Sequence, residues 1–145
     1  MVPSIAVSGC NPSSARQDAV ESTASEGGLD TGVQFALTPE ARRVLERRAE
    51  QGDGAAAHRI AQHYGMAGGD SGFAGDPKNS VEEDRWLKRA SELGYESAKL
   101  SWAVKTGRRD CPGARRMLAD LVRNGSNAGI RDAAQAWIDD DYLCR

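Results

Sequence analysis

The 145-residue sequence predicts an all-α protein, a short α-solenoid of three antiparallel helical hairpins. Alanine is abundant and β-branched residues are sparse, which favours helices because alanine loses no side-chain entropy in a helix. No short stretch alternates cleanly between apolar and polar residues, so strands are not expected. Gly52, Gly94 and Gly125 each stand between two segments with helical periodicity. We expect three equivalent chain reversals there, because glycine tolerates the left-handed conformation that ends a helix and turns the chain.

The composition excludes several classes of protein. The 19 basic and 21 acidic side chains give a net charge of −2, so no excess of positive charge is present for binding nucleic-acid phosphates. No apolar run approaches the roughly 18 to 20 residues that cross a bilayer. We therefore expect one helical domain, most simply a monomer, that neither binds nucleic acid nor spans a membrane.

Residues 11–37 are expected to form a flexible, disordered linker. From Asn11 to about Gly32 the chain is rich in Ser, Gly, Glu, Asp and Pro and has no apolar period. Such a segment buries too little surface to offset the entropy lost on ordering. The helical domain is expected to occupy residues 38–145.

Six helices are expected in this domain, joined within each pair by very short turns. They cover, approximately, residues 39–51, 53–66, 80–93, 96–106, 111–124 and 127–140. Thr38 is the predicted N-cap of the first helix, with Pro39 at its first position. Ser80 and Glu83 form a predicted capping box at the start of the third.

Aligning the chain on the three glycines reveals a repeat. A large apolar residue and its neighbour precede each glycine, and small and then apolar positions follow it. The preceding pairs are Val44-Leu45, Trp86-Leu87 and Met117-Leu118, and the following pairs are Ala56 and Ile60, Ala98 and Trp102, and Gly129 and Ala133. Small side chains let two helices approach closely, and the three tryptophans are expected in the core.

Two of these units resemble a known repeat family. Arg48–Asp53 followed by Ala56, Ile60 and Tyr64, and the second copy Trp86–Ala98, are similar to the Sel-one-like repeat, a relative of the tetratricopeptide repeat. The resemblance covers about residues 40–138, although the spacing of the glycines is uneven. It implies stacked hairpins with an extended surface suited to gripping a protein or peptide.

A second resemblance concerns residues 1–10, interpreted as the remnant of a signal peptide. Val7-Ser8-Gly9-Cys10 resembles a bacterial lipobox. The resemblance implies a lipid anchor at Cys10 as the one membrane contact, and a domain in the periplasm at the outer membrane of a Gram-negative bacterium. Residues 1–6 lack the usual charged and apolar regions, so an ordinary thiol at Cys10 is the alternative.

The other two cysteines frame the last helical pair. Cys111 begins one expected helix and Cys144 follows the end of its partner, so antiparallel packing brings them close together. We expect a disulfide between them, in agreement with an oxidising compartment, with two free thiols as the alternative.

Two acidic segments are candidates for partner binding. In the Gly-rich loop of residues 67–79, Asp70, Phe73 and Asp76 are the candidates, with a flexible insertion as the alternative. Near the C-terminus, Asp139, Asp140 and Asp141 form either an acidic patch for a basic partner or a solvated helix end.

No catalytic, cofactor-binding or metal-binding residues are predicted. The letters Gly-Asp-Ser-Gly at residues 69–72 are shared with serine proteases, but a nucleophilic serine needs a base and an orienting acid on a rigid scaffold. His58 and His63, the only histidines, lie about 140° apart around one expected helix, so they do not readily share a metal ion.

The function expected from these observations is binding of another protein, without enzymatic activity. By analogy with small anchored binding proteins, the preferred hypothesis is an immunity protein that neutralises a secreted antibacterial effector. One alternative is an envelope scaffold or adaptor. Another, suggested by cysteine-rich relatives of the repeat family, is a cell-wall or β-lactam hydrolase, although this chain lacks a cysteine pair in each repeat.

Overall fold

The computed structural model describes residues 32–73 and 75–145. The predicted lipidation site Cys10 and most of the predicted linker lie outside these residues. The described part contains six α-helices, three short 3₁₀ helices and no strand, which confirms the all-α prediction. Among the described residues, no helix has the length and apolar character needed to cross a membrane.

The helices are α1 (Pro39–Glu50), α2 (Gly54–Met66), α3 (Pro77–Glu92), α4 (Glu96–Thr106), α5 (Cys111–Asn124) and α6 (Ala128–Asp139). The 3₁₀ helices are η1 (Val33–Phe35), η2 (Gly69–Ser71) and η3 (Asp141–Cys144). The predicted N-cap of α1 is confirmed, because the Thr38 hydroxyl accepts a hydrogen bond from the N–H of Ala41 at 3.2 Å and Pro39 follows it.

The predicted start of α3 is wrong. The helix begins at Pro77, and Asp76 is its N-cap, accepting a hydrogen bond from the N–H of Lys78 at 3.0 Å. Ser80 is exposed inside the helix and caps nothing, so the predicted capping box does not form. The reason is local: Asp76-Pro77 offers an acceptor and a preset φ angle about one turn before Ser80.

Two of the three predicted glycine turns have the expected conformation. Gly52 and Gly94 have φ angles of 97° and 84°, in the left-handed region that favours glycine. Gly125 is different, with φ −63° and ψ 138°, so the prediction of three equivalent reversals is wrong.

A contact with an earlier helix explains the third turn. The Glu96 carboxylate, in the first turn of α4, accepts hydrogen bonds from the N–H groups of Ser126 at 2.5 Å and Asn127 at 3.1 Å. Arg131 donates to the carbonyl oxygen of Gly125 at 2.9 Å. These tertiary contacts hold the α5–α6 turn in extended backbone, so no left-handed residue is required there.

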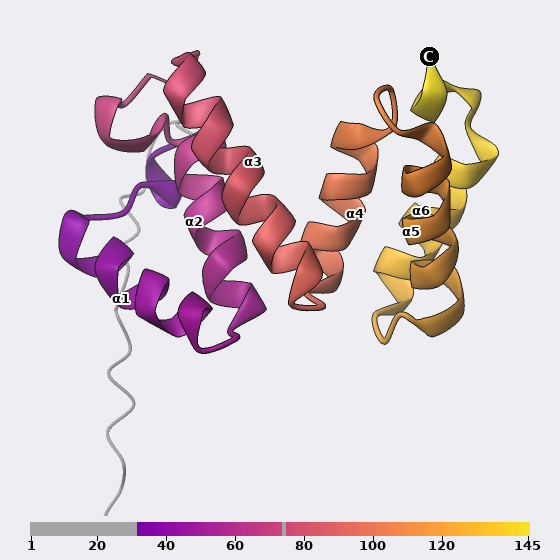
Figure 1. Ribbon diagram of the computed structural model, residues 1–145, viewed down its shortest axis with the longest axis horizontal. Helices are drawn as coiled ribbons and strands as arrows, with labels where there is room; N and C mark the ends of the chain where they lie inside the picture. Colours follow the sequence, from indigo (N-terminus) through magenta and orange to yellow (C-terminus); the bar gives the residue numbers. More distant parts are fainter. Residues whose placement is uncertain (1–31, 74) are drawn as a thin grey trace, which may run out of the picture.

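Consecutive helices contact one another in chain order, and α2 also lies between α1 and α3 (Figure 1). Two apolar clusters form the core. The first joins α1, α2, α3 and the start of α4, and includes Ile60 and the predicted core residue Trp86, which is 7% exposed. The second joins the end of α4 to α5, α6 and η3 around Leu118. Trp102 and Trp137 are half-buried against the first and second clusters respectively.

The predicted disulfide between Cys111 and Cys144 is present, with the two Cα atoms 5.3 Å apart. It ties η3 to the start of α5. Leu143, beside it, is 2% exposed and belongs to the second core cluster. The disulfide therefore holds the C-terminal turn over the end of α4.

Candidate functional site

The surface between α1 and α3 is hollowed in two adjoining places, which we call the α1–α3 groove. One hollow, of about 400 Å³, lies along the C-terminal halves of both helices and is lined by Ala49, Glu50, Arg85, Trp86, Lys88, Arg89 and Glu92. The other, of about 730 Å³, is lined by Glu46, Tyr64, Asp70, Ser71, Asp76, Lys78, Asn79, Val81, Glu82 and Arg85. Because Arg85 lines both, they adjoin along α3.

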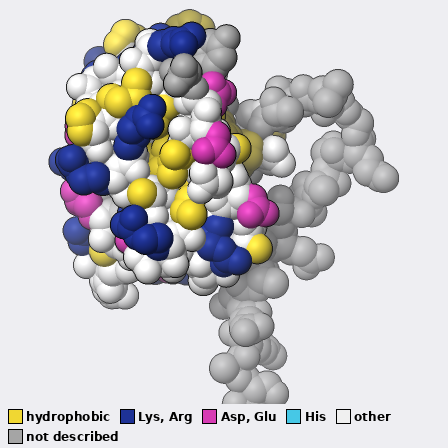
Figure 2. All heavy atoms as spheres, turned by 90° about the vertical axis from the view of Figure 1, so that its right-hand side faces the viewer, with side chains coloured by type: hydrophobic (Ala, Val, Ile, Leu, Met, Phe, Trp, Pro, Cys, Tyr) yellow, Lys and Arg dark blue, Asp and Glu magenta, His cyan; other side chains and the backbone are white. Residues whose placement is uncertain are grey.

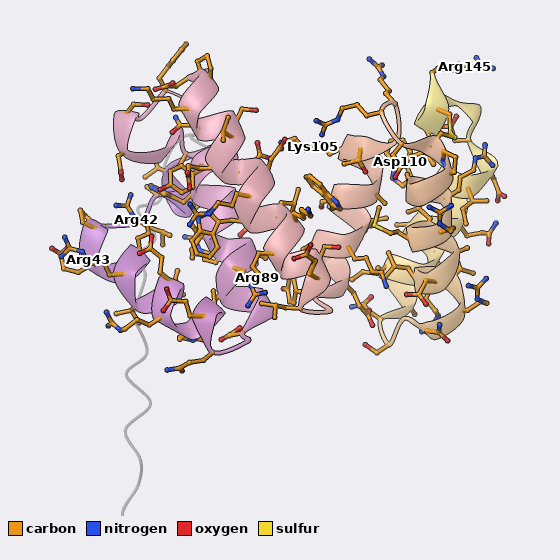
Figure 3. The ribbon with its side chains drawn as sticks, viewed as in Figure 1. Arg42, Arg43, Arg89, Lys105, Asp110 and Arg145 are labelled. Atoms are coloured by element: carbon orange, nitrogen blue, oxygen red, sulfur yellow. A yellow bond between two sulfur atoms is a disulfide. The ribbon has the colours of Figure 1, made fainter. Side chains whose placement is uncertain are left out.

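The smaller hollow, along the C-terminal halves of α1 and α3, combines an aromatic base with charged side chains. The Arg85 guanidinium lies 5.0 Å from the centre of the Trp86 ring, a cation–π contact. Lys88 lies 3.8 Å from Glu92, both largely exposed, so this ion pair is weak. Arg89, labelled on α3 in Figure 3, has no ion pair with a described residue. The wall therefore presents charges that remain accessible to a partner.

The Gly-rich loop closes the other end of the groove and is held by Asn79 of α3. Its side-chain amide is buried and donates hydrogen bonds to the carbonyl oxygens of Gly68 at 2.6 Å and Phe73 at 3.1 Å, and to Ser71 Oγ at 3.1 Å. Gly68 has a φ angle of 76°, and a Cβ there would lie 2.6 Å from the carbonyl carbon of Gly72. Asn79 was not predicted from the sequence, where the signal is an amide side chain in the first turn of a helix that follows a Gly-rich loop.

Two of the predicted partner-binding residues lie on the wall of the larger hollow. Asp70 is 61% exposed and forms an ion pair with Arg42 of α1. Asp76 caps α3. Phe73, also predicted, is 67% exposed between them in the loop, and its ring lies against Gly75. The structure thus brings Asp70 and Asp76 to one site and leaves Phe73 available beside it.

The second predicted acidic segment lies elsewhere. Asp139 ends α6, at the opposite end of the molecule from the groove (Figure 1), and accepts a hydrogen bond from Gln135 at 2.8 Å. Asp140 is the exposed C-cap of the same helix. The backbone of Asp141 begins η3, and its side chain lies outside the described part. None of these residues lines the α1–α3 groove.

Behind the loop, His63 and Arg42 support Asp70. His63 Nε2 lies 3.6 Å from Asp70 Oδ1, and Arg42 lies 3.5 Å from Glu46. The hydrogen bond from Arg42 holds the pKa of Asp70 below its usual value. The His63 side chain is 2% exposed, and burial lowers its pKa, opposed by Asp70. Because Leu37 N–H occupies Nδ1 at 3.2 Å, His63 acts here as a packing and hydrogen-bonding group.

His58 faces a different neighbour. Its ring centre lies 5.0 Å from that of Tyr95, and burial lowers its pKa. Among residues 32–73 and 75–145, no group of three or more His, Cys, Asp or Glu side chains is arranged to hold a metal ion.

Comparison of the chain with protein-family models, with curated proteins and with solved structures found no match. The resemblances to the Sel-one-like repeat and to a lipobox therefore stay predictions from the residues that carry them.

Proposed function

We propose that this chain is a protein-binding α-solenoid and that its α1–α3 groove receives an extended segment of a partner protein. The observation that carries the proposal is the groove itself, two hollows that adjoin at Arg85 between helices belonging to successive hairpins. Concave surfaces between successive helical units are where repeat proteins bind extended ligands. The accessible charges and the aromatic base at Trp86 suit a polar peptide.

The solenoid is part of the proposal. Its units are the helix pairs α1–α2, α3–α4 and α5–α6, each joined by a short turn and each packed on the next pair in chain order. In this arrangement α1 and α3 are equivalent first helices, with α2 behind them. The groove is then a property of stacking, because neither hairpin encloses it alone.

We propose further that binding neutralises the partner, as an immunity protein neutralises a secreted effector. The setting is the periplasm, with anchoring through Cys10. Two features support this role: the Cys111–Cys144 disulfide suits an oxidising compartment, and an ordered loop beside an exposed Phe73 provides a firm edge for a tight complex.

Site-specific photocrosslinking tests the groove. A photoreactive amino acid is placed at Arg89 in the groove and, as a control, at the exposed Gln135 of α6. Full-length chain with each substitution is irradiated in cells of its source, and crosslinked proteins are identified by mass spectrometry. The proposal expects one partner captured from position 89 and not from position 135.

The captured partner is then purified and its binding measured by calorimetry. Arg89→Glu is expected to weaken binding by about tenfold or more, whereas Arg43→Glu, the same charge change outside the groove, leaves it within about twofold. The neutralising role expects the partner's toxicity or activity to fall when the chain is added in equal amount. Equal crosslinking from both positions would overturn the proposal that the groove binds the partner. Turnover of peptidoglycan or of a β-lactam, if one polar substitution abolished it, would overturn the proposal that the chain has no enzymatic activity.

A further inference from the structure

We infer that the outward side of α5 is a second interaction surface, one that binds an acidic segment of a partner protein. It is formed by Arg115, Arg116 and Arg123 of α5, which we call the α5 arginine face, and Arg108 stands just before the helix. With 3.6 residues per turn, the three helical arginines fall on the side opposite the buried Leu121. All four arginines are exposed.

The four arginines stand outside the ion pairs of the described part of the chain. None of them forms an ion pair with a described carboxylate. The nearest acids in the sequence are Asp110, which accepts the N–H of Gly113 as the N-cap of α5, and Asp120, which pairs with Lys99 of α4 and whose pKa Arg123 also lowers. The α5 arginine face therefore offers exposed guanidinium groups on a chain whose net charge is −2.

Figure 2 looks onto the end of the molecule formed by α5 and α6, where Lys and Arg side chains are spread among neutral, apolar and acidic ones. Between the arginines of α5 stand the small residues Pro112 and Ala119. Small neighbours let a partner's carboxylates approach the guanidinium groups closely.

An acidic protein segment fits this surface better than the other anionic partners. Arginine's planar fork pairs with a carboxylate through two hydrogen bonds, and such pairs act over short range because the Debye length is about 8 Å at physiological salt. A bilayer or a nucleic acid presents a wide negative surface. Such a surface approaches the whole chain and is repelled by its negative net charge.

The placement of exposed apolar residues also argues against a bilayer. The large exposed hydrophobic side chains of the described part are Val33, Val44, Met66, Phe73 and Val81. All of them precede α4, so the α5 arginine face has no large apolar side chain to insert among lipids.

Peptide binding to the full-length chain tests the inference. The probe is a fluorescent twelve-residue peptide of alternating Glu and Ser, and its counterpart carries Gln in place of Glu. Fluorescence anisotropy is measured at low and physiological salt. The Glu peptide is expected to bind, more weakly as salt rises, and the Gln peptide at least about tenfold more weakly.

A pair of matched variants locates the binding. Arg115→Glu with Arg116→Glu is expected to weaken binding of the Glu peptide by about tenfold or more, because it reverses two charges on the face. Arg43→Glu with Arg47→Glu makes the same charge change on α1, where both arginines are exposed and without a described ion pair, and is expected to stay within about twofold. Circular dichroism checks that both variants remain folded.

Three outcomes would overturn the inference: equal weakening by the α1 and α5 variants, equal binding of the Glu and Gln peptides, or binding only to vesicles of anionic phospholipid. A fourth experiment changes Asp18, Glu21, Glu26 and Asp30 to their amides and measures binding of the Glu peptide again. Tenfold stronger binding would also overturn the inference, because the chain's own acidic segment would then be the occupant of the face. The result is separate from the proposed function, which depends on crosslinking from the α1–α3 groove.

Discussion

The backbone N–H of Leu37 donates a hydrogen bond to Nδ1 of His63 over 3.2 Å. A neutral imidazole has one acceptor nitrogen and one N–H, so this contact assigns the proton to Nε2, which faces Asp70 at 3.6 Å. Arg59 binds the same preceding segment by donating to the carbonyl oxygens of Gln34 and Phe35, each at 2.9 Å. The segment before α1 is thus tied to α2 by His63, whose Nδ1 accepts this hydrogen bond only while the imidazole is neutral.

This contact makes stability depend on pH. Burial, with smaller contributions from Arg42 and Arg59, lowers the pKa of His63 below its ordinary 6.5, so the unfolded chain takes up a proton before the folded protein does. The free energy of unfolding is therefore expected to fall as pH falls from about 6.5 through the lowered pKa, and to level off below it. Denaturant unfolding between pH 8 and pH 5 measures the effect.

The control separates the two histidines. His63→Gln is expected to flatten the profile in that window, and His58→Gln to remove a further part, because burial lowers the pKa of His58 as well. Asp70 does not titrate in this window. Arg42 lowers its pKa, so the stability that the ionised carboxylate contributes is lost only as the pH falls below about 3.8. A His63→Gln protein with the full wild-type dependence would contradict the assignment.

Removal of the disulfide is expected to destabilise the second core cluster. Cys111 and Cys144 are separated by 33 residues, and the loop-entropy relation gives about 3 to 4 kcal/mol for a bridge of this span. The double variant Cys111→Ser with Cys144→Ser is compared with the wild type by urea unfolding. Dithiothreitol should lower the free energy of unfolding of the wild type toward that of the variant and leave the variant's value unchanged. A difference below about 0.5 kcal/mol between the oxidised wild type and the variant would refute the expectation.

Gly107 is expected to be intolerant of a side chain. A Cβ at this position would collide with the carbonyl oxygen of Leu143, so Gly107→Ala must displace η3 and is expected to cost about 2 kcal/mol. Gly129 is the matched control, because a Cβ there lies 3.4 Å from Asn127 Oδ1, an ordinary contact. Gly129→Ala is expected to be neutral or to stabilise α6 by up to about 1 kcal/mol. Thermal unfolding that ranked the two variants the other way would disprove this packing.

Asn79 is expected to control the order of the Gly-rich loop. Asn79→Ala removes a buried amide whose two N–H groups are shared among three acceptors, and it is expected to cost about 2 to 3 kcal/mol. Hydrogen exchange should accelerate at residues 67–76 first. Ser80→Ala is the neighbouring control and is expected to stay within about 0.5 kcal/mol, because Ser80 is exposed and does not cap α3.

Much of the fold was predictable from the sequence. Five of the six helices lie within about two residues of their predicted bounds, because caps such as Thr38 and turns such as Gly52 and Gly94 depend on neighbouring residues alone. The disulfide was predictable because antiparallel packing of the last pair brings its two ends together. The error at α3 was also local: Asp76-Pro77 repeats the arrangement of Thr38-Pro39 and was overlooked.

Only the tertiary structure decided the rest. Glu96 sets the turn at Gly125 from about thirty residues away in the sequence, and Arg42 of α1 pairs with Asp70, which lines the larger hollow. Such contacts depend on how hairpins stack, and no local pattern encodes which side chains then meet. The sequence therefore determined the helices through short-range hydrogen bonding and backbone preference, whereas the hollows and the ordered loop arose from packing between distant segments.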